Sequence, residues 1–195
     1  MGGGACARDR GAQGACPQTP DMAQVTPPRP ISEGDERSHF DCGRDSLNTW
    51  FRLHAWHNHV SGISRTSVIC DARTGLIVGD VTLSAAHIER EFLAKAHRRN
   101  KPDPVPATLL GQLAVDRAYH GQGHARSLLH FALTTALRAS REIGSFGVLT
   151  HPVDEQVREF YRRWGFEDVP FDPRRSMIVR MVDLEKNGFV DWKKD

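Results

Sequence analysis

The sequence predicts a single α/β domain in which one mixed sheet carries helices on its faces. Strand-like runs alternate with helical patterns along the chain, and the strongest helix directly follows a continuous apolar strand. The composition is that of an ordinary globular protein, with 39% hydrophobic and 26% charged residues. A chain of 195 residues has the length of one domain with a single core.

The two ends of the chain are predicted to lie outside this domain. Residues 1–30 combine Gly, Ala, Pro and Gln with almost no large apolar side chains. Such a segment cannot bury enough surface to offset the entropy lost on ordering. We therefore expect a disordered tail over residues 1–29, a folded domain over 30–187 and a C-terminal tail over 188–195.

Hydrophobic periodicity and turn residues locate the elements of the domain. Apolar positions three and four residues apart predict helices over 45–59, behind a capping Asp45, over 125–137 and from Asp154 to Gly165. Segment 88–106 is charged and closed by prolines, which predicts a short helix or a loop. Alternating or continuous apolar runs predict strands over 65–71, 76–85, 107–116, 146–150 and 176–184, the first two forming a hairpin at Thr74-Gly75.

Charge, cysteines and hydropathy exclude several classes of protein. The 26 Lys and Arg and 24 Asp and Glu give a net charge of +2, too small to imply nucleic-acid binding without a local basic patch. The four cysteines have neither zinc-finger nor CxxC spacing, so we expect free thiols and no metal site. No run approaches 18 apolar residues, and the N-terminus lacks the apolar core of a secretory signal. We therefore expect a cytoplasmic protein.

A glycine turn joins the predicted central strand to the strongest helix, in the segment HGQGHARSLL (120–129). Gly121 and Gly123 have no Cβ, so the backbone there can approach a ligand closely. The helix start adds unpaired N–H groups and a positive dipole end, which together predict a pyrophosphate site. No Gly-Lys-Ser/Thr follows as in a P-loop, and the third glycine of a Rossmann GxGxxG fingerprint is absent. The alternative is a tight turn whose glycines only satisfy backbone geometry.

The segment AVDRAYHGQGHARSLL resembles motif A of the Gcn5-related (GNAT) N-acetyltransferases, a Gln/Arg-x-x-Gly-x-Gly/Ala turn that follows the central strand. Gly123 and Ala125 match its last two defined positions, and His120 replaces the usual Gln or Arg. REFYRRWGFEDV (158–169) is similar to the family's FY…GF segment. The resemblance covers roughly residues 30–184. It implies a mostly antiparallel sheet with a splayed central strand, and acetyl-CoA as the cofactor.

The same resemblance implies the residues of the cofactor site. Backbone amides around Gly121 to Ala125 would hold the pyrophosphate, the pantetheine arm would lie along the splayed strand, and an amide near Val115 would polarise the thioester carbonyl. Tyr161 would protonate the leaving thiolate. The alternative for Tyr161 is a core aromatic on one apolar face with Phe160 and Trp164. The implied cofactor-binding residues are Leu113, Ala114, Val115, His120, Gly121, Gln122, Gly123, His124, Ala125 and Arg126.

No residue is a strong candidate for a general base. His54, His57 and His59 spread around the first predicted helix, which favours solvated or packing side chains. His151 follows the strand expected to flank the acceptor side. A water, or an amine already partly neutral at the working pH, is an alternative.

Within the GNAT family, the chain looks most similar to the toxins of type II toxin–antitoxin systems that acetylate the α-amine of aminoacyl-tRNA and stop translation. Gln112 stands where these toxins often have Arg. The resemblance implies a ribbon–helix–helix antitoxin as a partner, and homodimerisation is common in the group. The matching segments are FDCGRDSLNTWFRLHA, SRTSVICDARTGLIVGDVTLS, PVPATLLGQLAVDRAYHGQG and THPVDEQVREFYRRWGF.

An aminoacyl-tRNA acceptor would need a positive surface, and the sequence offers two basic clusters. We expect tRNA to bind the first cluster, of which Arg90, Lys95, Arg98 and Arg99 are the candidates together with Lys101; the second holds Arg162, Arg163, Arg174 and Arg175. Solvated charged faces are the alternative. Two other functions stay open. Acetylation of a small amine or a protein N-terminus predicts an acidic acceptor cleft, and a noncatalytic acyl-CoA-binding module predicts that Tyr161 is dispensable.

Overall fold

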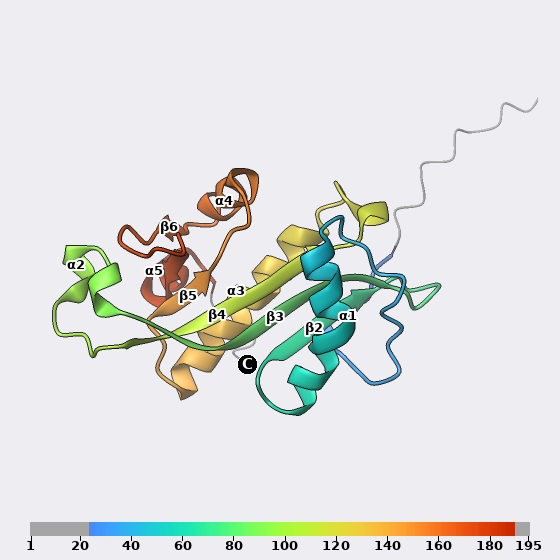
Figure 1. Ribbon diagram of the computed structural model, residues 1–195, viewed down its shortest axis with the longest axis horizontal. Coiled ribbons are helices and arrows are strands. Elements are labelled where there is room, and N and C mark those ends of the chain that lie inside the picture. Colours follow the sequence, from blue (N-terminus) through green and yellow to red (C-terminus); the bar gives the residue numbers. More distant parts are fainter. Residues whose placement is uncertain (1–23, 190–195) are drawn as a thin grey trace, which may run out of the picture.

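The computed structural model describes residues 24–189 and arranges them around one seven-stranded sheet, in the order β1-β2-β3-β4-β5-β7-β6 (Figure 1). All neighbouring strands are antiparallel except β4 and β5, which are parallel. The predicted mixed, mostly antiparallel sheet is confirmed. The strands are β1 (Arg29–Pro30), β2 (Arg65–Cys70), β3 (Ile77–Ile88), β4 (Val105–Val115), β5 (Gly147–Thr150), β6 (Glu167–Asp168) and β7 (Met177–Arg180).

Helices cover both faces of the sheet, with α1 on one face and α3 on the other (Figure 1). On α3, the predicted apolar stripe packs onto β3 and β4, and its six buried residues have at most 2% of their surface exposed. The buried side of α1 carries Phe51, which packs against Phe40 with ring centroids 4.8 Å apart. The helices are α1 (Asp45–Val60), α2 (Lys95–Arg98), α3 (His124–Glu142), α4 (Glu155–Arg162) and α5 (Met181–Lys186), with short 3-10 turns η1 (Arg90–Phe92) and η2 (Arg117–Tyr119).

The central strand β4 separates from β5 halfway along its length. The two strands pair only from Thr108↔Val148 to Leu110↔Thr150, where β5 ends, whereas β4 continues to Val115. At the same point β4 bulges, because Leu110 and Gln112 pair with consecutive residues of β3 and leave Gly111 over. Within the described part of the chain, residues 111–115 therefore have a strand neighbour on one side only. We call the open side the slot.

Several boundaries differ from the sequence prediction. Val25 bridges Asp71 and β1 begins at Arg29, so the sheet takes in residues that we assigned to the N-terminal tail. These contacts use main-chain groups along the edge of β2, which leave no hydrophobic pattern in the sequence. The rest of the predicted tails, residues 1–23 and 190–195, lies outside the described residues.

The C-terminal prediction of one strand over 176–184 is wrong. The strand ends at Arg180 and α5 follows, burying Met181 and Leu184 against α3 and the sheet. Their three-residue spacing fits a helix, but the alternation that precedes them concealed the change of period. Phe189, placed in the predicted C-terminal tail, packs against Trp164 with ring centroids 6.0 Å apart.

Two smaller differences concern ends of elements. The N-cap of α1 is Arg44, not Asp45, which lies in the first turn of the helix. Segment 88–106 contains η1 and α2, as the prediction of a short helix or a loop allowed, and β4 begins within it at Val105. No helix between residues 24 and 189 is both long and apolar enough to cross a membrane. Cys42 and Cys70 are free thiols, and Cys6 and Cys16 lie outside the described residues.

Candidate active site

The glycine turn after β4 presents a row of unpaired backbone amides. In the part of the chain that the structure describes, no acceptor bonds the N–H groups of residues 121–125, which we call the cradle. Gly121 and Gly123 have φ of +77° and +86°, the left-handed region that favours glycine. Gly123 is the N-cap of α3, so the free amides and the positive end of a 19-residue helix face the same point. This geometry suits an anionic ligand.

His120 attaches the cradle to the end of β4. Its Nε2 lies 2.7 Å from the carbonyl oxygen of Val115, so the ring spans the five residues between strand and turn. A neutral imidazole with its proton on Nε2 donates this bond, as does the imidazolium. The residue that departs from motif A thus has a structural contact of its own, which the sequence pattern did not suggest.

A pocket of about 690 Å³ opens beside the cradle and runs into the slot. This volume is within the range of small-molecule and cofactor sites. All the predicted cofactor-binding residues line it except Gln122. The lining residues are Leu113, Ala114, Val115, His120, Gly121, Gly123, His124, Ala125 and Arg126, together with Cys42, Arg44, Leu47, Tyr119, Gln156, Val157, Phe160 and Tyr161.

The segment before α1 contributes a wall of the pocket that no residue pattern had indicated. Asp41 is fixed by its backbone N–H to Asp116 Oδ2 (2.9 Å) and by Asn48 Nδ2 to its own Oδ1 (2.8 Å). The N–H of Cys42 donates to Asn48 Oδ1 (2.9 Å). These bonds hold residues 41–44 against the end of β4 and place Arg44 at the pocket. The only sequence signal was the segment FDCGRDSL, which entered through the family resemblance and not through a residue pattern.

Tyr161 lies where the slot begins. Its side chain is 5% exposed, lines the pocket and packs between Phe160 and Phe166, with ring centroids 5.4 and 5.1 Å away. Thr150 lies beside this phenol, and the Thr150 hydroxyl donates to the carbonyl of Leu110 (3.2 Å). Leu110 and Thr150 are the last paired residues of β4 and β5. The phenol therefore packs as a core aromatic and also lines the pocket, a position compatible with both sequence interpretations.

Burial raises the pKa of Tyr161 to about 12. The phenol consequently keeps its proton at neutral pH. His124, at the cradle, has a pKa below its usual value because it is partly desolvated, so its ring is mostly neutral at pH 7.

A carboxyl group is buried under the wall formed by β4. Asp80 of β3 pairs with Ala114 and is fully buried, so both side chains lie on the α1 face of the sheet. Its Oδ1 accepts a 3.4 Å hydrogen bond from Gln112 Nε2, and its Oδ2 has no partner among the described residues. Burial raises the pKa of Asp80 to about 8. In the sequence, the only sign of this group is an acidic residue inside an apolar strand.

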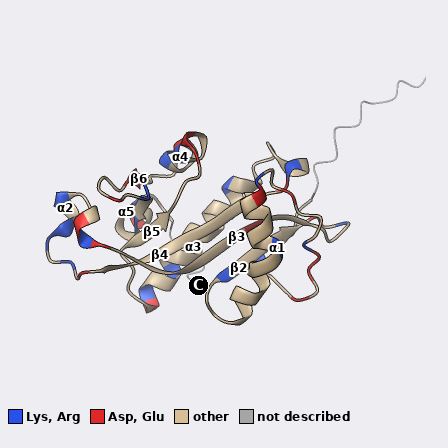
Figure 2. Cartoon of the chain, viewed as in Figure 1, with Lys and Arg blue, Asp and Glu red and all other residues tan. Residues whose placement is uncertain are grey.

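The first basic cluster is not at the pocket. Arg90, Lys95, Arg98 and Arg99, which we call the α2 patch, precede β4, whereas the cradle follows it (Figures 1 and 2). The ten steps from Val105 to Val115 span about 33 Å. Arg98 bonds the backbone, through Nε to Leu93 O (2.8 Å) and Nη2 to Glu91 O (2.6 Å). The side chains of Lys95 and Arg99 are exposed and have no ion pair with any residue from 24 to 189.

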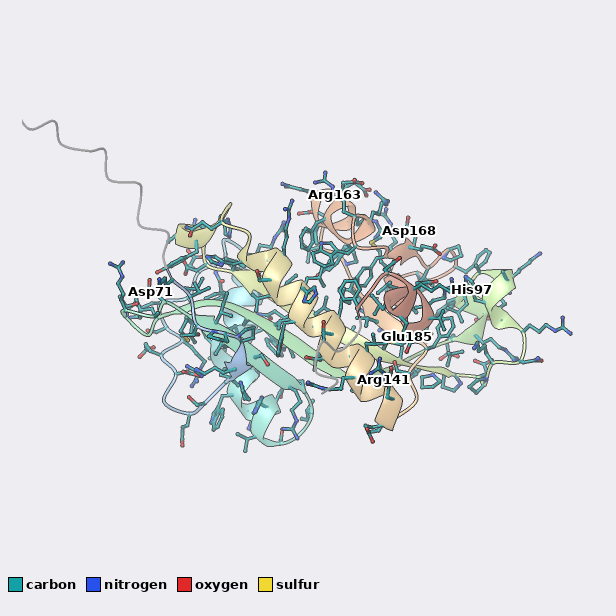
Figure 3. All side chains as sticks on the ribbon, turned by 180° about the vertical axis from the view of Figure 1, so that it is seen from behind. Asp71, His97, Arg141, Arg163, Asp168 and Glu185 are labelled. Atoms are coloured by element: carbon teal, nitrogen blue, oxygen red, sulfur yellow. The ribbon has the colours of Figure 1, made fainter. Side chains whose placement is uncertain are left out.

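The second basic cluster is largely neutralised by acidic neighbours. Arg162 pairs with Glu155 (2.8 Å) and Asp168 (3.3 Å), and Arg163 with Glu159 (3.6 Å). Figure 3 shows Arg163 and Asp168 together at the α4–β6 side of the molecule. These arginines therefore fit the alternative of a solvated charged face.

His59 and His151, two of the histidines considered as general bases, lie apart in the structure. His59 accepts a hydrogen bond from the N–H of Thr66 (3.1 Å) and stacks on Trp56 with centroids 6.1 Å apart, which is a packing role. His151 is exposed and is not among the pocket residues.

Comparisons with known proteins agree with this geometry. Residues 65–168 match the family model of the acetyltransferase (GNAT) domain. The chain is 37% identical over 158 residues to the tRNA-acetylating toxin of Mycobacterium tuberculosis (strain ATCC 25618 / H37Rv), an alignment covering 81% of this chain and 94% of that protein.

Two solved toxins share the fold. AtaT complexed with acetyl-methionyl-tRNAfMet superposes with a TM-score of 0.77 at 25% identity, and covers 84% of this chain and 99% of its own. A tyrosine-to-phenylalanine mutant of KacT gives a TM-score of 0.78 at 26% identity, with the same coverage.

Proposed function

Because the chain belongs to the GNAT acetyltransferase family, we propose that it acetylates the α-amine of aminoacyl-tRNA and acts as the translation-blocking toxin of a toxin–antitoxin pair. Family membership makes it an acetyl-CoA-dependent N-acetyltransferase. The choice of acceptor is supported by one observation above all: 37% identity to a tRNA-acetylating toxin over 94% of that protein's length.

The cradle and the slot lie one after the other along one pocket, as the pyrophosphate and the pantetheine arm do along acetyl-CoA. Five free amides and the start of α3 suit the pyrophosphate, with Arg126 in the first helical turn as an added cation. Alternate backbone groups of residues 111–115 face the slot, where a pantetheine arm can take hydrogen bonds that a strand would otherwise make. Bound acetyl-CoA supplies an acetyl group activated as a thioester.

Residues along the slot would then serve the transfer. A β4 amide near Val115 donates to the carbonyl oxygen as negative charge develops there. Tyr161 donates the proton of its Oη to the departing sulfur. A phenol with a pKa of about 12 is a weaker acid than a thiol, so this transfer is uphill by itself, and the tyrosinate regains its proton from water to complete the cycle. The amine sheds its own proton to water, since the pocket lining in the described chain contains no carboxylate and its two imidazoles, His120 and His124, lie at the cradle, where the pyrophosphate would bind.

The pocket itself argues against a polycationic acceptor. None of its lining residues is Asp or Glu, whereas the cationic residues Arg44 and Arg126 both line it. A polyamine or an aminoglycoside would need acidic partners in the cleft. An aminoacyl ester attached to a polyanion suits this charge, and its α-amine is less basic than a lysine, so more of it is nucleophilic at neutral pH.

The body of the tRNA would contact the α2 patch. We keep Arg90, Lys95, Arg98 and Arg99 as the proposed surface, with Lys95 and Arg99 as the residues whose charges are free to meet phosphates. A tRNA is long enough to reach both the patch and the pocket, which lie about 33 Å apart along β4. A ribbon–helix–helix antitoxin, homodimerisation and a cytoplasmic location complete the proposal, on the strength of the toxin resemblance.

Transfer of radiolabelled acetyl from acetyl-CoA tests the proposal directly. Purified protein is incubated with total tRNA that is either aminoacylated or deacylated, and label in the tRNA is measured. We expect label only with charged tRNA, and mild alkaline hydrolysis of the ester should release it as N-acetyl amino acid. Label that instead accumulates on polyamines, aminoglycosides or ribosomal proteins under the same conditions would reject the tRNA acceptor.

A further inference from the structure

Arg44, which lines the pocket, forms an ion pair with Asp154 and so links the start of α1 to the start of α4. The two residues are 110 positions apart in the chain, and Arg44 lines the pocket together with Gln156, two residues after Asp154. The side chains of Arg44 and Asp154 are 43% and 36% exposed. Solvent therefore reaches both groups, and the pair can exchange partners at little cost.

Neither element needs this ion pair for its own structure. Asp154 caps α4 by accepting the N–H of Val157 through Oδ1 (2.8 Å), whether or not Oδ2 is paired. Arg44 occupies the N-cap position of α1 but makes no side-chain cap. Its backbone follows Gly43, whose N–H is bonded to Asp41 Oδ1 (2.8 Å). The backbone before Arg44 is thus held in place, while the Arg44 guanidinium makes no contact that caps α1.

Arg44 reaches the pocket from a different side than the cradle. The cradle begins α3, which packs on one face of the sheet, whereas Arg44 begins α1, which packs on the other (Figure 1). The five free amides and Arg126 already match the pyrophosphate on the α3 side. Arg44 is therefore a second cationic position, on the side of the slot that α3 and its core leave open for an acceptor.

Resting on the proposed function, we infer that Arg44 binds a phosphate at the mouth of the pocket, where a phosphodiester near the 3′ end of the acceptor tRNA replaces Asp154 as its partner. A guanidinium matches phosphate oxygens in a bidentate fashion, as it does a carboxylate. Asp154 holds the side chain in place until that exchange. The same chemistry suits a phosphate of the cofactor, so the experiment must separate the two sources.

Arg44→Ala tests the inference by kinetics on matched substrates. The acceptors are aminoacyl-tRNA and an aminoacyl-adenosine analogue, amide-linked at the 3′ position, made with and without a 5′-phosphate. We expect the KM for aminoacyl-tRNA to rise about tenfold, which is the effect of losing one hydrogen bond to a charged group. The kcat should stay within about twofold of the wild-type value. The KM for the phosphorylated analogue should rise by a similar factor, and the KM for the phosphate-free analogue should not change. The slope of log kcat/KM against log salt should fall in magnitude by about 0.7, one phosphate contact on a single strand.

Three further variants distinguish the loss of one phosphate contact from a general loss of structure. Arg44→Lys keeps the charge and should retain most of the salt slope. Asp154→Asn keeps an N-cap but removes the competing charge, and should lower the KM for aminoacyl-tRNA a few-fold. Arg138→Ala removes an exposed arginine far along α3, about 21 Å from its first turn, and should change neither the KM nor the slope.

The outcomes show whether Arg44 binds a phosphate of the tRNA, a phosphate of the cofactor, or none. If Arg44→Ala instead weakens acetyl-CoA binding in calorimetry, with a smaller loss for acetyl-dephospho-CoA, the phosphate belongs to the cofactor. If KM, salt slope and cofactor affinity are all unchanged, or if the phosphate-free analogue is affected equally, Arg44 binds no phosphate. A wild-type protein inactive on every aminoacyl-tRNA would refute the proposed function, and the cofactor comparison alone would then decide the role of Arg44.

Discussion

The two ends of β4 carry positive charge in two physically different forms. At the C-terminal end the charge is mostly main-chain: five free amides, fixed by left-handed Gly121 and Gly123 and by the His120–Val115 bond. At the N-terminal end it lies on long side chains, of which Lys95 and Arg99 are exposed. Fixed dipoles select one anion at short range, whereas exposed side chains attract a polyanion at long range and are screened by salt. The proposed function thus assigns the cofactor to one end of β4 and the body of the tRNA to the other.

The largest expected effect comes from the reacting centre at the pocket end. Tyr161→Phe retains the ring contacts with Phe160 and Phe166 and removes only the hydroxyl. Because general-acid catalysis contributes about 10²–10⁴-fold, we expect kcat to fall by at least about 100-fold. The acetyl-CoA dissociation constant, measured by calorimetry, should change less than about twofold. Full turnover by Tyr161→Phe would return this residue to a packing role.

The pH dependence of turnover provides a second check on this group. Burial raises the pKa of Tyr161 to about 12, so the phenol is protonated throughout the range in which the protein is assayed. Its ionisation therefore adds no falling limb to the kcat profile between about pH 7 and 10. A limb in that range that disappears in Tyr161→Phe would contradict the assigned protonation state.

The sheet between the two ends contains one group that opposes folding. Asp80 has a folded-state pKa of about 8 against an ordinary value of 3.8. Between these values the unfolded state releases the proton and the folded state keeps it, so stability is full below about pH 4 and falls as pH rises to 8. At about 1.4 kcal/mol per pH unit, the loss at pH 7 approaches about 4 kcal/mol.

Asp80→Asn should therefore raise the melting temperature, and more at pH 8 than at pH 5. With about 2–4 °C per kcal/mol for a domain of this size, the gain at neutral pH is on the order of 10 °C. Thermal unfolding followed by circular dichroism at several pH values measures it. A pH-independent difference between variant and wild type would show that the Asp80 carboxyl is not the origin of the loss.

Much of the fold could be predicted because its elements are specified locally. The stripe on α3 has an unambiguous helical period, and β4 is a continuous apolar run. The edge strand β1 and helix α5 escaped prediction for opposite reasons. β1 depends on main-chain pairing that any sequence can make, and α5 begins where a two-residue period passes into a three-residue one.

The site divides in the same way. Glycine positions and the helix start are local signals, so the cradle was predictable from residues 120–125. Arg44 and Asp80 were not, because their roles come from partners far along the chain, at Asp154 and Gln112. Arg98 was assigned to tRNA on charge alone, yet its guanidinium bonds two carbonyls of its own loop. Sequence charge does not tell which cations are already satisfied.

A moderate effect is expected at the cradle. Gly123→Ala places a side chain at φ +86°, which costs about 1–2 kcal/mol for a non-glycine residue, although its Cβ meets no protein atom within 4 Å. The turn should relax away from this geometry and weaken acetyl-CoA binding about tenfold. Gly75→Ala is the matched control, since Gly75 has φ +73°, is equally open and lies in the β2–β3 turn. Equal loss of cofactor affinity in both variants would point to general destabilisation.

The smallest effect is expected at the α2 patch, where single contacts are exposed and screened. The double variant Lys95→Glu, Arg99→Glu should raise the KM for aminoacyl-tRNA a few-fold. It should also reduce the salt slope of kcat/KM by about one or two units, one for each tRNA phosphate that the variant no longer neutralises. Arg98 stays unaltered because its replacement would release the loop at Leu93 and Glu91. Cofactor affinity should not change, since the cradle lies about 33 Å away along β4.

The matched control for the patch changes net charge equally at other exposed positions. Arg138→Glu with Lys186→Glu lies outside the α2 patch and should leave the salt slope as in wild type. A slope that falls only in the patch variant would show that the tRNA body contacts Lys95 and Arg99 directly. If both double variants behave alike, the patch acts only through overall charge, and the distinction between the two ends of β4 holds for the cofactor end alone.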